Sequence, residues 1–244
     1  MLISETNTSI AKEKIRQFVL SPDENVAEIP ENKKPKLLEA LKEVKICDPA
    51  IGSGAFPMGL LNGLLSCREA LEHLDVPRSE IKRSIIHNNI YGVDIEKGAV
   101  DIARLRFWLS IVVDEEKASP LPNLDYKIMQ GNSLVESFMG VDLNNLSYKT
   151  TCKKDDTDNG LFDDEKVLLQ KQVSRLLSKY YSCSDHEQKI TIQQEISAAI
   201  NKQLEVQSFD PLILKILKDV NLAGNSQFFL WHTWFSEVFN RPDG

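Results

Sequence analysis

The feature that most constrains the fold of this sequence is a glycine-rich turn between a short strand and a helix. Residues 44–47 suit a buried strand, and Pro49 ends it because proline has no N–H to donate to a neighbouring strand. The backbone can then reverse tightly at residues 52–54, where two glycines flank a serine. Leucines at helical spacing predict a helix that runs to about residue 74: Leu60, Leu61, Leu64 and Leu65. This order places a helix N-terminus, with its unpaired N–H groups, at a strand end where a ligand can bind.

The following segments repeat this strand-and-helix order. Residues 79–89 predict a helix, residues 90–95 a strand, and residues 97–113 an amphipathic helix. The core positions expected on that last helix are Val100, Ala103, Leu105, Leu109 and Val112. A third strand is expected from Tyr126 to Met129, closed by residues 131–133. The alternation predicts an α/β fold with a parallel, doubly wound sheet.

A polar side chain lies at the end of each predicted strand. A carboxylate beside the glycine turn, Asp48, suits a zwitterionic or cationic ligand better than a pyrophosphate, and the turn lacks the Gly-x-Gly-x-x-Gly pattern of dinucleotide-binding folds. Asp94 could accept hydrogen bonds from both hydroxyls of a ribose. Asn132 offers a donor and an acceptor to an adenine edge, although Asn beside glycine is also ordinary turn chemistry. Because strand ends in such a sheet face one crevice, we expect these side chains to line a ligand site.

Net charge and cysteine content limit the classes of partner. The net charge of −7 argues against a chain that grips DNA by itself, since phosphate contacts need clustered Lys and Arg. The cysteines are Cys47, Cys67, Cys152 and Cys183. Their scatter favours neither a zinc site nor a disulfide framework, so we expect no metal site. We expect reduced thiols, with Cys47 buried at a strand end.

The sequence carries no sign of membrane insertion or secretion. No apolar run approaches the roughly 20 residues that cross a bilayer. The N-terminus lacks the charged-then-apolar plan of a secretion signal. We therefore expect a cytoplasmic protein without membrane contact.

Composition and periodicity divide the chain into four expected parts. These are an N-terminal helix and linker (1–37), an α/β core (38–140), a helical hairpin insertion (141–220) and an aromatic helix that returns to the core (221–244). The first helix is expected around Ile10 to Leu20, and residues 21–36 predict a linker because they are polar and carry three prolines. An acidic loop at residues 151–165 is the expected boundary of the insertion.

Two segments of the second half allow more than one interpretation. Long helices at residues 166–181 and 186–206 predict an antiparallel pair, either a structural insertion or a clamp on DNA or a partner. The apolar positions of the pair are Leu168, Leu169, Val173, Leu176, Leu177, Ile192, Ile196 and Ile200. The aromatic residues of the last segment, if helical, favour core packing over stacking on nucleobases. They are Phe229, Trp231, Trp234, Phe235 and Phe239.

Three segments resemble the cofactor motifs of one enzyme family. Residues 48–56, Asp-Pro-Ala-Ile-Gly-Ser-Gly-Ala-Phe, closely resemble motif I of adenine-N6 DNA methyltransferases. Residues 88–112 are similar to the motif II region, and residues 121–134 to motif III in the style of the bifunctional type IIG restriction-modification enzymes. The resemblance covers residues 38–140 and, less closely, residues 228–240. It implies a Rossmann-like methyltransferase sheet that binds S-adenosylmethionine.

The resemblance also implies roles for individual residues. The methionine portion of the cofactor would be surrounded by Asp48, Ala50, Gly52, Gly54 and Phe56, and Pro49 and Ser53 of the same motif would also bind the cofactor. Asp94 would hold the ribose, with Ile95 packed on the adenine. Asn132 and Ser133 would lie near the amino edge of the adenine.

The sequence departs from the family at the motifs that complete the enzyme. The family's catalytic Asn-Pro-Pro-Tyr motif engages the target adenine, which is flipped out of the duplex, but this chain contains no Pro-Pro dipeptide. The aromatic-Thr-Pro element of the family is not visible in residues 1–45. We therefore expect a chain that is truncated at both ends, contains no catalytic residue and is catalytically inactive by itself.

The activity implied for the parent protein is adenine-N6 methylation of double-stranded DNA in a restriction-modification system, with or without an endonuclease domain. A companion domain or chain would supply the missing parts. The alternative is a non-catalytic Rossmann-like scaffold or interaction module, which the acidic charge favours and the intact cofactor motifs disfavour. A nucleotide-dependent oxidoreductase is disfavoured by the absence of Gly-x-Gly-x-x-Gly.

Overall fold

A computed structural model of the chain describes residues 12–72, 76–115, 121–143, 161–183, 185–206 and 210–239. The chain divides into two compact units. The first comprises Met1–Gly92 and Gly98–Pro122, and the second comprises Val93–Lys97 and Asn123–Gly244. In the described parts of the chain, no helix has the length and apolarity to cross a membrane.

Helices form most of the described part of the first unit, and two short strands lie between them in the sequence. Its elements are α2 (Lys12–Leu20), α3 (Pro22–Asn25), the 3₁₀ turns η1 (Val26–Glu28) and η2 (Glu31–Lys33), α4 (Lys34–Glu43), β1 (Ile46–Asp48), α5 (Ala55–Leu71), α6 (Arg78–Asn88), β2 (Ile90–Asp94) and α7 (Lys97–Val112). Strand β2 and the start of α7 cross into the second unit.

The segment predicted as an irregular linker is folded. Between α2 and α4 the chain makes α3 and two 3₁₀ turns. Ile29 lies in this segment and is buried in one cluster with Phe18, Leu37 and Cys67. The prolines do not prevent these turns, because proline is tolerated in the first turn of a helix, where Pro22 lies in α3. The linker prediction for residues 21–36 is therefore wrong.

The predicted strand, turn and helix around the glycines are present as β1 and α5. Strand β1 is shorter than predicted, three residues that end at Asp48. Helix α5 begins after Gly54, and Pro57 lies in its first turn, where its missing N–H leaves no partner unsatisfied. The helix buries Leu61 and Leu65 and ends at Leu71, because Glu72 is extended, so the predicted end near residue 74 is wrong.

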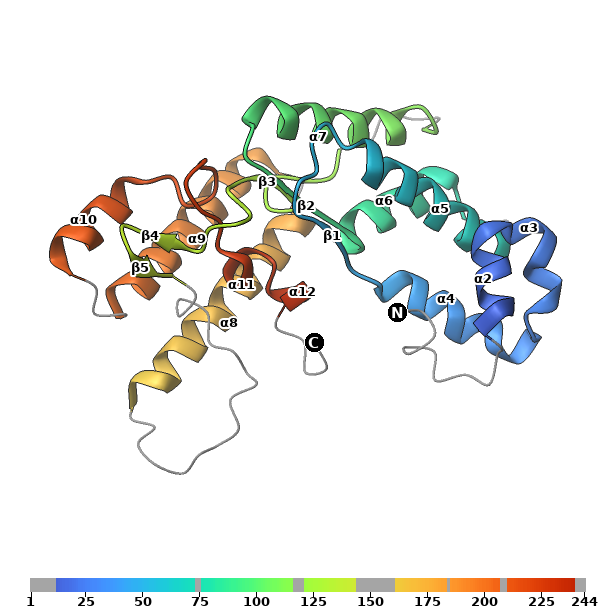
Figure 1. Cartoon of the computed structure of the whole chain (residues 1–244), viewed down its shortest axis with the longest axis horizontal. Helices are drawn as coiled ribbons and strands as arrows, with labels where there is room; N and C mark the ends of the chain where they lie inside the picture. The colour runs from blue at the N-terminus through green and yellow to red at the C-terminus, as the bar shows by residue number, and fades with distance from the viewer. Residues whose placement is uncertain are drawn as a thin grey trace. The chain divides into compact units, whose positions relative to one another are not determined.

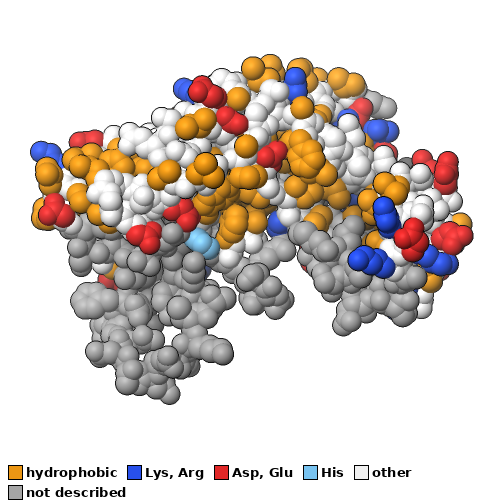
Figure 2. Space-filling model, in the orientation of Figure 1, with side chains coloured by type: hydrophobic (Ala, Val, Ile, Leu, Met, Phe, Trp, Pro, Cys, Tyr) orange, Lys and Arg blue, Asp and Glu red, His pale blue; other side chains and the backbone are white. Residues whose placement is uncertain are grey.

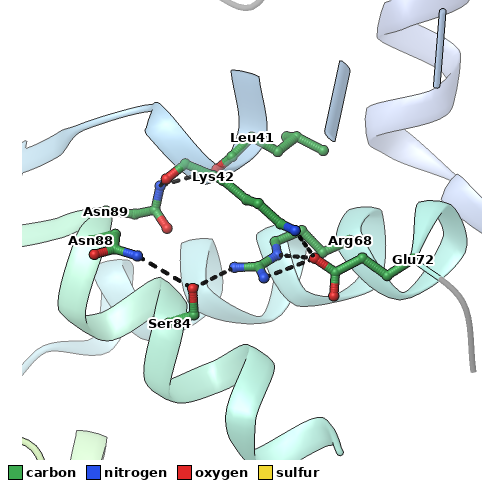
Figure 3. Close-up of polar contacts among 7 residues, drawn as sticks. All are labelled: Leu41, Lys42, Arg68, Glu72, Ser84, Asn88 and Asn89. Atoms are coloured by element: carbon green, nitrogen blue, oxygen red, sulfur yellow. Dashed lines mark hydrogen bonds and ion pairs between the residues drawn. The ribbon is translucent and has the colours of Figure 1, made fainter. Parts of the chain in front are cut away.

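A buried amide and an ionic cluster join α4, α5 and α6 (Figure 3). Asn89 is fully buried, and its Nδ2 donates to the carbonyl oxygens of Leu41 at 3.0 Å and Val44 at 2.6 Å. Leu41 lies in the last turn of α4 and Val44 is its C-cap residue, so the amide caps the end of the helix. Close by, Glu72 accepts from Arg68 at 2.8 Å and pairs with Lys42 at 3.0 Å.

We predict that Asn89→Ala lowers the free energy of unfolding by about 2 kcal/mol, because it strands buried carbonyl oxygens without a donor. Urea unfolding followed by circular dichroism measures this loss. Asn62→Ala, at an exposed position of α5, is the control and should change stability by less than about 0.5 kcal/mol. Equal effects of the two substitutions would contradict the capping role.

Helix α7 is present, but its predicted core face is partly wrong. Val100 and Ala103 are buried as expected. Three other predicted core residues are about half exposed: Leu105, Leu109 and Val112. Phe107 and Ile111 are buried instead. Hydrophobic side chains consequently remain visible along α7 in the space-filling view (Figure 2).

The sheet has the strand order β1-β2-β3 (Figure 1), where β3 spans Ile128–Gln130. Strands β1 and β2 run parallel, in a register that places Asp48 opposite Gly92. The third strand begins two residues later than predicted, because the N–H groups of Lys127 and Ile128 close a turn on the carbonyl of Leu124. The chain is thus a mixed helix-and-strand protein, as the α/β prediction requires.

In its described residues, the second unit combines β3 with a hairpin and five helices. Its further elements are β4 (Ser137–Phe138), β5 (Val141–Asp142), α8 (Leu161–Ser182), α9 (His186–Val206), α10 (Pro211–Asp219), α11 (Trp231–Trp234) and α12 (Ser236–Phe239). Strands β4 and β5 are antiparallel and were not predicted. Met139 and Gly140 both have positive φ, of 49° and 79°, as a two-residue hairpin turn with right-handed strand twist requires.

The predicted helix pair is formed by α8 and α9. Leu169, Val173 and Leu177 of α8 are buried, as are Ile192, Ile196 and Ile200 of α9. Leu168 is 64% exposed, so its predicted place on the apolar face is wrong. Residues 151–160 of the predicted acidic boundary loop lie outside the described residues, and residues 161–165 form the start of α8, so the loop prediction is wrong there.

Polar contacts tie the end of α8 to the segment before β3. Asn123 donates its Nδ2 to the carbonyl oxygen of Tyr180 at 2.7 Å. The Tyr180 hydroxyl donates to Asp125 at 2.5 Å, and burial together with this carboxylate raises the pKa of Tyr180 well above its usual value. The hydroxyl therefore stays protonated and keeps its role as a donor.

The aromatic segment at the end of the chain is not one helix. Residues 228–230 have no regular structure, and two four-residue helices, α11 and α12, follow. Most of its large side chains are buried, which agrees with the core-packing interpretation: Phe228, Phe229, Leu230, Trp234 and Phe235. Trp234 stacks on Tyr126 with ring centroids 5.3 Å apart. Phe239 remains 40% exposed.

Candidate functional site

The glycine turn after β1 has the backbone geometry that only glycine adopts readily. Gly52 and Gly54 have φ values of 54° and 83°. The N–H of Gly54 donates to the carbonyl oxygen of Ile51 at 2.9 Å and closes the turn. A Cβ on Gly54 would lie 3.1 Å from the Cβ of Ala103, so the turn also approaches α7 closely. A side chain at Gly54 would therefore be strained by the positive φ and crowded by α7.

Asp48 begins the turn as a half-buried carboxylate. Its Oδ1 accepts from the N–H of Ala50 at 3.0 Å, which fixes the carboxylate at the end of β1. Pro49 and Ala50 are exposed, Ser53 is half-buried, and Phe56 at the start of α5 is 67% exposed. An acceptor and an aromatic surface thus border the same turn.

The thiol beside this carboxylate is not a nucleophile at neutral pH. Burial, reinforced by the negative charge of Asp48, raises the pKa of Cys47 to about 12. The thiolate, which is the reactive form, is therefore scarce. Cys47 is half-buried rather than buried as predicted, whereas Cys67 is 2% exposed. Both are free thiols, as is Cys183, while Cys152 lies outside the described residues.

Packing between Ile51 and Gly92 fixes the turn against the second strand. Ile51 is 4% exposed. A Cβ on Gly92 would lie 2.2 Å from its Cδ1 and 3.0 Å from its Cβ. The glycine in β2 therefore makes the room that the isoleucine of the turn occupies.

Asp94 lies at the end of β2, where the sequence predicts it. Its Oδ1 accepts from the N–H of Glu96 at 2.9 Å, and the carboxylate is half-buried. Ile95 is 45% exposed, and its carbonyl oxygen accepts from Gln130 Nε2 at 3.1 Å. The strand end presents an acceptor and an exposed aliphatic side chain.

The structure brings the segment after β3 next to Asp94. The N–H of Gly131 donates to the carbonyl oxygen of Asp94 at 2.9 Å. Asn132 and Ser133 are half-buried, and Asn132 Oδ1 accepts from the N–H of Leu134 at 3.2 Å, which is ordinary turn chemistry. Leu134 is 92% exposed. Asp48 and the glycine turn belong to the first unit, whereas Asp94, Ile95, Asn132 and Ser133 belong to the second.

Sequence reasoning missed one part of this neighbourhood, an open pocket of about 380 Å³ beside Ser133. Its lining residues are Ser133, Leu134, Val135, Glu136, Ser137, Asp142 and Trp231. Trp231 donates its Nε1–H to the carbonyl oxygen of Ser133 at 3.1 Å. The density of aromatic residues in the last segment was the only sequence signal, and it does not show which side chain bonds to the segment after β3.

Within the second unit, the polar groups at the ends of β2 and β3 suit an organic ligand that combines polar and apolar parts. Asp94 is followed in the sequence by the exposed Ile95, and Asn132 is followed by the exposed Leu134. Among the described residues, no three His, Cys, Asp or Glu side chains are grouped as metal ligands would be. The carboxylate of Asp94 can accept from a vicinal diol, and the apolar groups can cover a flat ring.

Comparison with known proteins identifies relatives for most of the chain. Residues 88–244 match the Eco57I restriction-modification methylase family, a range that includes Asp94 and Asn132 but begins after the glycine turn. Over 145 residues the chain is 37% identical to a Methanocaldococcus jannaschii protein named as a type II restriction enzyme and methyltransferase. The alignment covers 55% of this chain and 12% of that relative, so the chain spans a small part of the relative's length. No solved structure matches the chain. Because the family match extends over more than half of the sequence, this chain belongs to the Eco57I restriction-modification methylase family.

Proposed function

We propose that this chain is the S-adenosylmethionine-binding portion of an adenine-N6 DNA methyltransferase of a restriction-modification system. Membership of a restriction-modification methylase family supports the reaction class. The observation that carries the cofactor assignment is the end of β2, where the oriented carboxylate of Asp94 is followed by the exposed side chain of Ile95. S-adenosylmethionine needs both kinds of contact, because it joins an amino acid, a ribose and an adenine.

Each portion of the cofactor is assigned to one strand end. Asp48 and the turn from Pro49 to Phe56 bind the methionine portion, where the carboxylate of Asp48 faces its ammonium group. Asp94 accepts from the ribose hydroxyls, and Ile95 packs on the adenine. Asn132 and Ser133 lie near the adenine amino edge. Bound here, S-adenosylmethionine supplies the electrophilic methyl group of the reaction.

In this proposal the three-stranded sheet is part of a Rossmann-like methyltransferase sheet. The parallel register of β1 and β2 and the helices that connect successive strands support it. Residues 38–140 form the cofactor-binding core, and residues 141–220 form a helical insertion. The buried apolar residues between α8 and α9 favour the structural interpretation of that insertion over a DNA clamp.

We further propose that these 244 residues do not transfer methyl groups by themselves. The family's catalytic motif contains two adjacent prolines, and this sequence has no Pro-Pro dipeptide. Double-stranded DNA is the substrate of the longer protein, which a companion domain or chain completes. The net charge of −7 supports placing most of the phosphate contacts there.

Calorimetric titration of the 244-residue chain with S-adenosylmethionine and, separately, with NAD tests the proposal. The expected result is saturable heat and a higher melting temperature with S-adenosylmethionine only. A parallel assay for methyl transfer to DNA should show no turnover. Binding of NAD instead would identify a dinucleotide fold, and binding of neither ligand would favour the non-catalytic scaffold.

A further inference from the structure

The loop that follows β3 is held in place by the aromatic segment near the end of the chain. The N–H of Phe229 donates to the carbonyl oxygen of Val135 at 2.9 Å, and Trp231 Nε1 donates to that of Ser133 at 3.1 Å. A Cβ on Gly131 would lie 2.4 Å from the Phe229 ring, so the ring covers the start of the loop. The loop is fixed at its beginning, middle and end by residues from a distant part of the sequence.

Aromatic packing also holds the Trp231 indole that reaches this loop. Its ring lies 4.7 Å from the ring of Phe229, 5.8 Å from that of Phe235 and 5.3 Å from that of Phe239, all in edge-to-face arrangements. Such contacts restrict the orientation of the indole, and with it the direction of the Nε1–H bond. The carbonyl of Ser133 therefore meets a donor of fixed position.

We propose that Trp231 is a positioning residue for the adenine end of the cofactor site. The inference rests on the proposed function, since it concerns the loop that carries Asn132 and Ser133. Trp231 acts through the Ser133 carbonyl and borders the 380 Å³ pocket beside it. Its hydrogen bond sets the path of the backbone from which both polar side chains project.

The loop needs this outside support because its own hydrogen bonds are few and local. Asn132 Oδ1 accepts from Leu134 N, and the carbonyl of Asn132 accepts from Val135 N at 3.2 Å. Leu134 is 92% exposed and adds no packing to the loop. A loop that is held mainly by residues outside it loses its preorganised shape when such a contact is removed. Ligand binding must then order the loop, and the lost conformational entropy weakens affinity.

The chain offers a matched control for the hydrogen bond. Trp234, in the same short helix α11, donates its Nε1–H to the carbonyl oxygen of Leu222 at 3.2 Å. Trp231→Phe and Trp234→Phe each remove an indole N–H and keep an aromatic ring. Trp234 is 3% exposed, so its substitution should cost at least as much stability. Of these two indole hydrogen bonds, only the one from Trp231 has its acceptor in the loop after β3.

The dissociation constants of two ligands distinguish a weakened contact at the adenine end of the cofactor from a weakened contact at its amino-acid end. S-adenosylmethionine contains the amino-acid portion, and 5′-methylthioadenosine lacks it while keeping the ribose and adenine. We expect Trp231→Phe to weaken both ligands by the same factor, roughly fivefold, the value of one hydrogen bond. Trp234→Phe should leave both dissociation constants unchanged, and Asp48→Ala should weaken S-adenosylmethionine alone.

The outcomes distinguish the inference from the proposed function. If the unaltered chain binds neither ligand, the proposed function fails. If it binds both and Trp231→Phe behaves like Trp234→Phe, the positioning role is wrong. If Trp231→Phe weakens S-adenosylmethionine but not 5′-methylthioadenosine, Trp231 acts on the amino-acid portion and the assignment to the adenine end is overturned.

Discussion

Replacing Asp94 with alanine is expected to weaken the binding of S-adenosylmethionine roughly 100-fold or more, because two hydrogen bonds from ribose hydroxyls to a carboxylate are lost. The carboxylate is already oriented by the N–H of Glu96, so the ligand does not have to order it. Asp94→Asn keeps one side-chain oxygen and should weaken binding less. Calorimetric titration of the three chains gives the ratios of the dissociation constants.

The neighbouring Glu96→Ala is the matched control for this series. Glu96 is exposed, and its substitution leaves in place the N–H that bonds to Asp94. Its affinity for the cofactor should equal that of the unaltered chain. If Asp94→Ala binds as tightly as Glu96→Ala does, the ribose is not held at the end of β2.

Replacing Gly92 with valine should lower the free energy of unfolding by roughly 3 kcal/mol, because it overfills a packed site. The first added carbon alone would approach Ile51 Cδ1 to 2.2 Å. Ile51 belongs to the glycine turn, so its displacement should also weaken S-adenosylmethionine binding. Urea unfolding and ligand titration of the same variant measure the two effects.

A second substitution at Ile51 tests whether this contact is the cause. Ile51→Ala alone creates a cavity and should cost roughly 2–4 kcal/mol. Combined with Gly92→Val, it should cost less than the sum of the single variants, because the valine side chain occupies the space that the isoleucine leaves. Gly63→Ala is the control, since a Cβ there meets nothing within 4 Å and should stabilise α5 by roughly 0.5–1 kcal/mol. Additive costs in the double variant would show that the two positions do not share the packing site.

Local sequence signals predicted the part of the fold that carries the candidate site. Pro49 and the glycines of the turn act on the backbone within a few residues, so their pattern shows where β1 ends and where α5 begins. The positions of Asp94 and Asn132 at the ends of β2 and β3 are confirmed for the same reason. Their roles toward a ligand stay predictions.

The features that the sequence did not predict correctly depend on contacts between residues far apart in the chain. Helix α7 carries apolar residues on more than one face, so periodicity alone could not show that Phe107 is buried while Leu105 is half exposed. The aromatic segment does not form the predicted single helix. At Phe229 the backbone N–H donates instead to the carbonyl oxygen of Val135, a partner far away in the sequence. Ile29 is buried by the helices around it although its own segment is polar.

The central claim is that S-adenosylmethionine binds at the ends of the three strands, and amide hydrogen exchange with and without the cofactor tests it most directly. Binding stabilises the native state and slows exchange most where the ligand contacts the chain. We predict slower exchange in residues 48–56, 94–97 and 131–135, with the amides of α9 changing far less. Unchanged exchange in these three segments at saturating S-adenosylmethionine would contradict the account.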